Sequence, residues 1–225
     1  MDGYYTIKNE CCGEITEKKS RFIATVRPVK SEDEALNFIQ EMKKKYWDAR
    51  HNCSAYIIAE TIAGNGEEKK VKITEKANDD GEPSKTAGSP ILEVIKGEGL
   101  KNCAVVVTRY FGGVLLGTGG LVRAYQAAVK AGLENSRIIE KREGIRASLT
   151  ADYTIVGKLQ YIFDKNKYTV LGSKYEESVT FTLLIPSEDW DSAQSAVTEA
   201  TAGQCEILKE DECIYGIVDK EAVVF

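Results

Sequence analysis

The chain contains 225 residues, of which 43% are hydrophobic and 29% are charged, a composition typical of a globular protein with one large domain or two small ones. No apolar run approaches the roughly 20 residues that a membrane-spanning helix needs, and the N-terminus lacks the pattern of a secretory signal, so no membrane partner is expected. The net charge of −5 is uneven, with 23 basic against 21 acidic residues through Glu143 and 7 against 14 after it, so a polyanionic partner is expected on the first part only.

The six cysteines indicate a reducing compartment. No pair has the C-x-x-C spacing of a zinc or redox site, and Cys53 and Cys103 lie in apolar runs that are typical of core positions. A chain of this size needs no disulfide framework, so we expect a cytoplasmic location. The sequence indicates neither a metal site nor a cofactor.

The first part of the chain mixes strands and helices. An apolar pattern at 20–29 predicts a strand, and Ser31 with Glu34 predicts the capping box of a helix. The stripe of this helix that is expected to be buried consists of Leu36, Ile39, Met42 and Tyr46. The next expected elements are a strand at 53–59, a turn at 63–68, a polar loop at 78–89, a short helix at 90–95, a strand at 104–108, a glycine-rich loop at 112–120 and a helix at 121–135.

A charged connector at 136–143 divides the chain into two expected domains, 1–138 and 144–225. The second domain follows the order β-α-β-β-α-β, which is the ferredoxin-like pattern. Its expected strands lie near 146–152, 170–175, 178–185 and 205–210, and its helices near 154–166 and 187–201. The predicted fold class is therefore α+β with two domains.

The glycine-rich loop is the first candidate site. Such a loop exposes backbone N–H groups and can approach a phosphate, and arginines flank it on both sides. The segment is neither a P-loop nor a dinucleotide-binding fingerprint. The glycines fit anion binding and close packing equally well. The candidate binding residues are Arg109, Gly112, Gly113, Gly117, Gly119, Gly120 and Arg123.

An acidic loop is the second candidate. Asp79, Asp80 and Glu82 offer oxygen ligands, but they lack the spacing of an EF-hand, and Asp and Gly are also common turn residues. We favour the turn interpretation, and we retain the three carboxylates with Thr86 as candidate binding residues.

His51 is the only histidine and the one candidate catalytic residue. Cys53 follows two positions later, so in a strand both side chains point to the same face of the sheet. A Cys–His catalytic pair is one alternative, and a packed Cys53 beside a structural His51 is the other.

Basic clusters form a third feature. They lie at 18–21, 43–45 and 69–72, and with Arg109 and Arg123 they could form a nucleic-acid face if they converge. For the cluster at 43–45, the end of a helix is a sufficient explanation, because basic residues there complement the helix dipole.

Four segments together resemble the YigZ/IMPACT family in order and spacing. They are residues 19–24 (Lys-Ser-Arg-Phe-Ile-Ala), 49–56, 79–88 and 108–125, and the resemblance covers essentially the whole chain. Lys85 departs from it, because Gly is expected there in many relatives. If that position needs a positive φ, lysine fits it poorly.

The resemblance implies a first domain with the β-α-β fold that a small-subunit ribosomal protein shares with a domain of elongation factor G. It implies a second domain similar to other elongation factor G modules. Eukaryotic relatives act in translational control, so the expected function is a regulator associated with translation that binds RNA, the ribosome or a protein partner. The family supplies no catalytic residue set, and a non-enzymatic role is favoured. The alternatives are a hydrolase that uses His51 with the Asp79–Glu82 loop, and a protein–protein adaptor.

Overall fold

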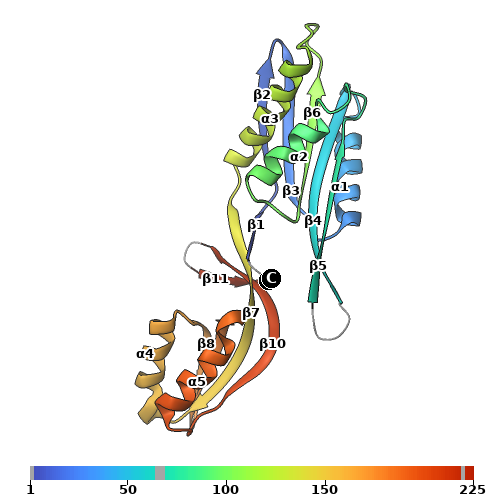
Figure 1. Cartoon of the computed structure of the whole chain (residues 1–225). Coiled ribbons are helices and arrows are strands. Elements are labelled where there is room, and N and C mark those ends of the chain that lie inside the picture. The colour runs from blue at the N-terminus through green and yellow to red at the C-terminus, as the bar shows by residue number, and fades with distance from the viewer. Residues whose placement is uncertain (1–2, 64–68, 219–220) are drawn as a thin grey trace. The chain divides into compact units, whose positions relative to one another are not determined.

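The computed structural model describes residues 3–63, 69–218 and 221–225. Its contacts divide them into a first domain, Tyr4–Ile139, and a second domain, which contains Gly3 and Glu140–Phe225. Both domains combine helices with β-sheet, so the chain is a two-domain α+β protein, as the sequence predicts (Figure 1). No helix in the described part of the chain is both long and apolar enough to cross a membrane.

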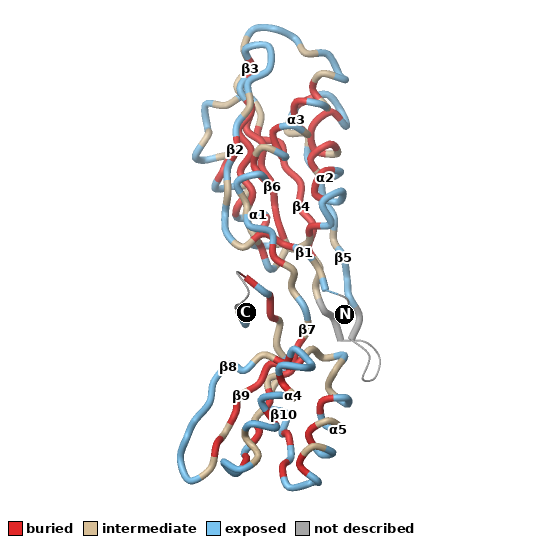
Figure 2. Tube along the Cα trace, turned by 90° about the vertical axis from the view of Figure 1, so that its left-hand side faces the viewer, coloured by how far each residue is buried: buried red, intermediate tan, exposed pale blue. Residues whose placement is uncertain are grey.

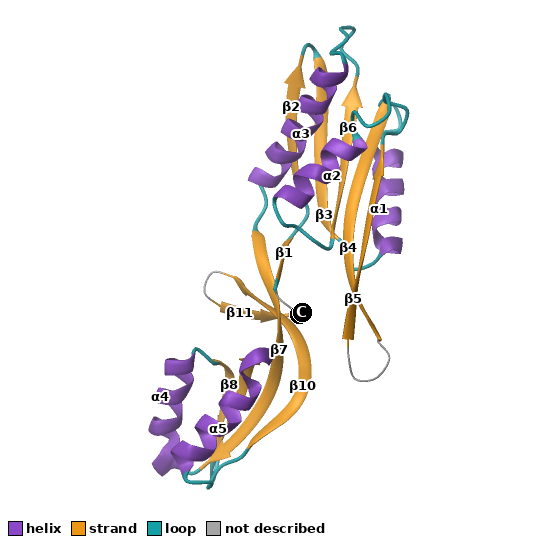
Figure 3. Ribbon diagram, viewed as in Figure 1, coloured by secondary structure: helices purple, strands orange, loops and turns teal. Residues whose placement is uncertain are grey.

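The first domain has three layers, with a five-stranded antiparallel sheet between helices (Figure 3). The strand order is β2-β3-β6-β4-β5. Helix α1 covers one face, while α2 and α3 cover the other. The elements are β1 (Tyr4–Ile7), β2 (Cys11–Glu17), β3 (Ser20–Pro28), α1 (Glu32–Lys45), β4 (His51–Ala63), β5 (Lys69–Asn78), α2 (Gly88–Gly97), β6 (Cys103–Tyr110) and α3 (Thr118–Glu134).

The central strands of this sheet are buried on both faces, which explains their continuous apolar runs (Figure 2). One core lies under α2 and α3 and includes Phe22, Val105 and Tyr125. The other lies under α1 and includes Phe38 and Ile58.

The helix α1 begins as predicted, and its buried stripe agrees with the prediction in part: Met42 is buried, and Ile39 and Tyr46 pack partly buried against the same core. The Ser31 hydroxyl accepts a hydrogen bond from the Glu34 N–H at 3.2 Å, so the cap is confirmed. Leu36, predicted to be buried, is 47% exposed. The buried residues are Ala35, Phe38 and Met42, because the helix turns its i, i+3, i+7 row towards the sheet.

Several predicted boundaries were wrong. Helix α3 begins at Thr118 rather than 121, so it includes the last glycines of the loop. Strand β7 begins at Ile138, so most of the expected connector is strand, paired with β10. Strands β2 and β5, the edge strands of the first sheet, were not predicted from the sequence. The predicted turn at 63–68 lies outside the described residues except for Ala63, which ends β4.

The second domain places two helices on one antiparallel sheet with the strand order β11-β10-β7-β9-β8 (Figure 1). The sequence predicted the order β-α-β-β-α-β, and the structure has this order from β7 to β10. The core packs Phe163 of α4 and Val197 of α5 against Phe181 of β9. The elements are β7 (Ile138–Ala151), α4 (Val156–Asn166), β8 (Thr169–Tyr175), β9 (Val179–Pro186), α5 (Trp190–Thr201), β10 (Ile207–Val218) and β11 (Glu221–Val224), with short 3-10 turns at Tyr153–Ile155 and Ser187–Asp189.

Candidate functional site

A cavity of about 350 Å³ lies in the first domain, beside the start of β4 and the end of β6. Antiparallel pairing of these strands places His51 directly opposite Arg109, and directly opposed residues share one face of a sheet. We call this space the Glu82 cavity. Its polar residues are Arg50, His51, Glu82, Arg109 and Thr118, and its apolar residues are Pro83, Phe111, Leu115, Leu116 and Leu121, with Gly81 and Gly117 completing the wall.

Arg109 and Glu82 form a buried ion pair in this wall. The Arg109 Nη1 donates to Glu82 Oε1 at 2.5 Å, and the two side chains are only 6% and 3% exposed. The Tyr125 hydroxyl donates to the same oxygen at 2.9 Å. Burial raises the pKa of Tyr125 far above its usual range, so this hydroxyl keeps its proton and remains a donor. Removing one member of such a buried pair costs roughly 3–5 kcal/mol, so Arg109 is part of the fold as well as of the cavity.

The hydrogen bonds of His51 fix which ring nitrogen carries the proton. Its Nδ1 lies 2.8 Å from the carbonyl oxygen of Asp80, which can only accept, so Nδ1 is the donor in the neutral ring. Its Nε2 lies 3.9 Å from Glu82 Oε1, and the side chain is 12% exposed. Nε2 is therefore an acceptor that can take a hydrogen bond or a proton from a bound molecule.

The carboxylates of Asp79 and Asp80 serve the fold. Asp79 Oδ1 accepts from the N–H groups of Ala87 and Gly88 at the start of α2, at 3.0 and 2.8 Å. Asp80 accepts from Lys43 Nζ at 2.6 Å and from the Asn52 N–H at 2.7 Å. Both carboxylates are therefore held by hydrogen bonds within the fold, as the turn interpretation expects, and neither lines the Glu82 cavity.

Thr86 also closes the acidic loop on itself. Its hydroxyl donates to the Pro83 carbonyl oxygen at 2.6 Å. Lys85 has φ 62°, so this position does require the left-handed conformation that glycine adopts most easily.

Three of the five loop glycines, Gly112, Gly113 and Gly117, have a structural reason for being glycine. A Cβ on Gly112 would lie 2.0 Å from the backbone carbon of Lys19, so close packing requires glycine there. Gly113 and Gly117 have φ values of 82° and 72°, whereas Gly119 has open space around it. The Glu82 cavity includes Gly117, and a neighbouring cavity includes Gly120.

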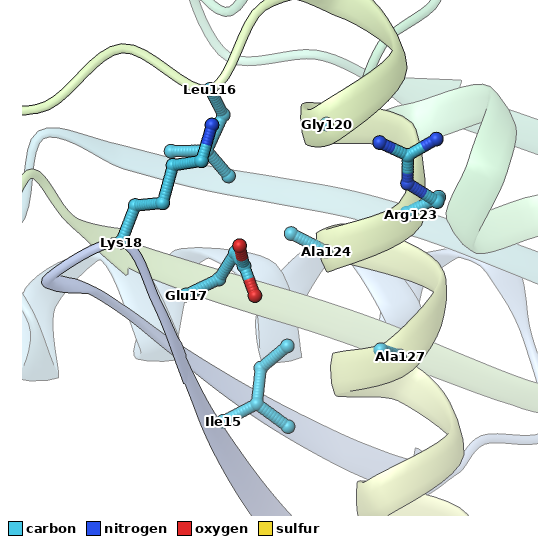
Figure 4. Close-up of a pocket in the computed structure, with 8 residues that line it drawn as sticks. All are labelled: Ile15, Glu17, Lys18, Leu116, Gly120, Arg123, Ala124 and Ala127. Atoms are coloured by element: carbon cyan, nitrogen blue, oxygen red, sulfur yellow. The ribbon is translucent and has the colours of Figure 1, made fainter.

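The neighbouring cavity, of about 260 Å³, contains Arg123, and we call it the Arg123 cavity. Glu17, the last residue of β2, and Lys18, in the turn that follows, line one side of it, while Arg123, Ala124 and Ala127 belong to α3 (Figure 4). Arg123 is exposed, and no described residue forms an ion pair with it. Arg109 and Arg123 therefore line different cavities. Because α3 begins at Thr118 rather than at 121, Arg123 lies in its second turn.

Cys53 is buried in the core rather than exposed in either cavity. Its sulfur lies 3.0 Å from the Asp79 carbonyl oxygen and 3.2 Å from the Tyr125 hydroxyl. Burial raises the pKa of this thiol far above its usual range, so it stays protonated, and a thiolate nucleophile is not favoured.

Comparison with known proteins identifies the family to which the chain belongs. The model described as "Impact N-terminal domain" matches residues 18–133, and a domain of unknown function (DUF1949) matches residues 149–204. IMPACT family member YvyE of Bacillus subtilis is 41% identical, over 96% of this chain and 94% of its own length. The chain belongs to the IMPACT family. IMPACT family member YigZ of Escherichia coli is 29% identical, over 87% of this chain and 92% of its own.

A solved structure is also similar over most of the chain. This crystal structure of a hypothetical protein aligns with a TM-score of 0.54 and 26% identity, over 94% of this chain and 98% of its own. The Impact N-terminal domain match, residues 18–133, contains every residue of the Glu82 cavity and, except for Ile15 and Glu17, those of the Arg123 cavity.

Two groups of cavity residues in this IMPACT-family chain were missed from sequence. Arg50 and Phe111 were recognised only as parts of motifs, although the Arg50 guanidinium lies 5.6 Å from the centre of the Phe111 ring. Leu115 was overlooked although it is 82% exposed. Apolar residues in a glycine-rich loop, where no core requires them, were the signal that could have identified Phe111 and Leu115.

Proposed function

We propose that this chain is a regulator associated with translation that binds structured RNA or the ribosome through its first domain. The association with translation comes from the family, whose eukaryotic relatives act in translational control. The RNA part is supported by one observation: Lys18 and Arg123, from basic segments far apart in sequence, line the same cavity (Figure 4). Glu17 offsets one of their charges, so the pair carries a modest local positive charge.

Aromatic and basic side chains support an RNA surface at the same end of the domain. Arg21 lies 6.0 Å from the centre of the Tyr110 ring, and Trp47 is 83% exposed. The Tyr110 hydroxyl donates to Asp48 at 2.9 Å, which ties the Trp47 segment to the end of β6. Bases of single-stranded RNA stack on such aromatic rings, while basic groups bind the phosphates.

The finer domain assignments belong to the same proposal. We propose domains 1–138 and 144–225, the first with the fold shared by a ribosomal protein and an elongation factor G domain. The strand order β10-β7-β9-β8 with two helices on one face supports a ferredoxin-like second domain. All six cysteines are free, which supports the cytoplasm as the location.

The hydrolase alternative loses two of its groups, because Asp79 and Asp80 are engaged in the fold. Only Glu82 remains beside His51, and it is paired with Arg109. Binding therefore accounts for the geometry better than hydrolysis by the acidic loop.

Arg123→Ala tests the RNA surface. If Arg123 contacts a phosphate, the variant should bind structured RNA and ribosomes more weakly across sequences, and the slope of log affinity against log salt should fall by about one unit. Filter binding of the full chain from low to high salt measures this. Lys101→Ala is the matched control. Lys101 precedes β6, so it lies at the end of that strand opposite to the glycine-rich loop that leads into α3.

Three outcomes separate the possibilities. A reduced slope for Arg123→Ala with an unchanged slope for Lys101→Ala supports the surface. Equal losses in both variants would show non-specific attraction. If the unmodified chain shows no salt-sensitive binding at all, a protein–protein adaptor replaces the RNA-binding function.

A further inference from the structure

We propose that the Glu82 cavity binds a small molecule that carries one phosphate or carboxylate group on an apolar or aromatic body. This goes beyond the RNA surface, because the Glu82 cavity and Arg123 are separate. A volume of about 350 Å³ lies at the lower end of the roughly 300–1,000 Å³ range of ligand pockets, which fits a small ring compound.

The start of α3 supplies the anion end of the site. Gly117 is the N-cap residue and has no side chain to bond the first turn, and that turn contains no acidic residue. The first intrahelical bond is from the Leu121 N–H to the Gly117 carbonyl, so the N–H groups of residues 118–120 precede it. An anion on these groups is stabilised by the helix dipole.

Arg109 is an independent indication of a missing partner. The residue is 95% buried in the wall of the cavity, and its Nε–H has no hydrogen-bond acceptor among the described residues. Buried donors are almost always satisfied in folded proteins, by protein, water or ligand. Its Nη2 donates to Ser20 Oγ at 3.4 Å, so the Nε–H is the donor of this guanidinium that retains hydrogen-bonding capacity.

The charges of the cavity favour an anion over a cation. Arg50 and Arg109 oppose the single carboxylate of Glu82, and Glu82 Oε1 is already occupied by Arg109 and Tyr125. His51 Nε2 adds an acceptor for a ligand O–H or N–H. The carboxylates of Asp79 and Asp80 do not line the cavity, and Asp80 is paired with Lys43.

The other wall of the cavity needs an apolar occupant. Leu121 is buried there, while Phe111 and Leu115 are 40% and 82% exposed. A ring packed against Leu115 and Leu116 would remove this apolar surface from water. A free inorganic anion would leave it exposed, so both parts of the ligand contribute to binding.

Nuclear magnetic resonance of the full-length protein can test the site directly, because His51 is the only histidine and gives a unique imidazole signal. Phenyl phosphate and benzoate are the two anionic probes, and they distinguish phosphate from carboxylate. We expect at least one of them to shift the His51 imidazole and the Thr118 and Gly119 amides in a saturable way. Inorganic phosphate and phenol, which each lack one part, should bind at least tenfold more weakly.

Thr118→Glu and Thr118→Gln form the matched pair of variants. Thr118 is exposed, so both should fold, and only glutamate places a negative charge in the first turn of α3. Phenyl phosphate should bind to the glutamate variant roughly tenfold more weakly than to the glutamine variant. Equal affinities, or probe shifts confined to Lys18 and Arg123, would overturn the proposal without bearing on RNA binding.

Discussion

At the scale of single residues, Lys85 shows how a local conformational cost arises. Its φ of 62° lies in the left-handed region, where a side chain with a Cβ costs about 1–2 kcal/mol relative to glycine. The position is nevertheless held, because the Lys85 N–H donates to Asp79 Oδ2 at 2.8 Å and thereby anchors the acidic loop.

Lys85→Gly should therefore stabilise the first domain by about 1 kcal/mol, less the entropy that glycine adds to the unfolded chain. Lys85→Ala is the control, because alanine removes the exposed side chain and keeps the Cβ. Urea unfolding of both variants measures the effect. If alanine stabilises as much as glycine, the lysine side chain rather than its backbone carries the cost.

Arg109 marks the limit of sequence reasoning at this scale. The motif placed it beside the glycine loop with Arg123, but its neighbours are set by the pairing of β4 with β6, which opposes it to His51. Its ion-pair partner, Glu82, is 27 residues away in a loop. Such long-range register follows from the whole sheet, so a pattern of neighbours along the chain does not reveal it.

At the scale of elements, the loop before α3 and the first turn of that helix contain one closely packed glycine, Gly112, and one with open space around it, Gly119. Gly112→Ala would bring a Cβ to 2.0 Å from the Lys19 backbone, so the loop or the β2–β3 turn must move. Gly119→Ala meets no atom within 4 Å, and it lies in the first turn of α3.

The two alanine variants should therefore have opposite effects. We expect Gly112→Ala to destabilise the first domain by roughly 1–3 kcal/mol through overpacking, and Gly119→Ala to stabilise it by up to about 1 kcal/mol through helix propensity. Thermal unfolding monitored by circular dichroism measures both. A neutral Gly112→Ala would show that the turn at Lys19 yields easily, and the close-packing explanation would then be wrong.

Strong apolar elements were predictable from sequence, and edge elements were not. Strands β3, β4 and β6 carry near-continuous apolar runs because both faces of the sheet are covered. Strand β5 has Val71 and Ile73 as its only large apolar residues, both exposed, among many charged ones, so its period-2 pattern is weak. The two cavities could not be predicted either, because each is formed by residues from separate elements that meet only in the folded domain.

At the scale of the whole molecule, two sets of buried residues share no member. The cores of the first domain draw on residues between Ile7 and Leu133, whereas the core of the second draws on Ile145 to Ile207. Each domain therefore has its own source of hydrophobic stabilisation, although β7 is one continuous strand through the predicted connector.

Independent cores predict two separable unfolding transitions. Phe38 and Phe163 are each 1% exposed, one in the first domain and one in the second, and replacing either by alanine should cost about 3–5 kcal/mol. Each substitution should lower only the transition of its own domain, by on the order of 10 °C. Scanning calorimetry of the full chain and both variants measures this, and each variant is the control for the other. If either substitution lowers both transitions equally, or if a single transition moves as a whole, the two domains unfold as one cooperative unit despite their separate cores.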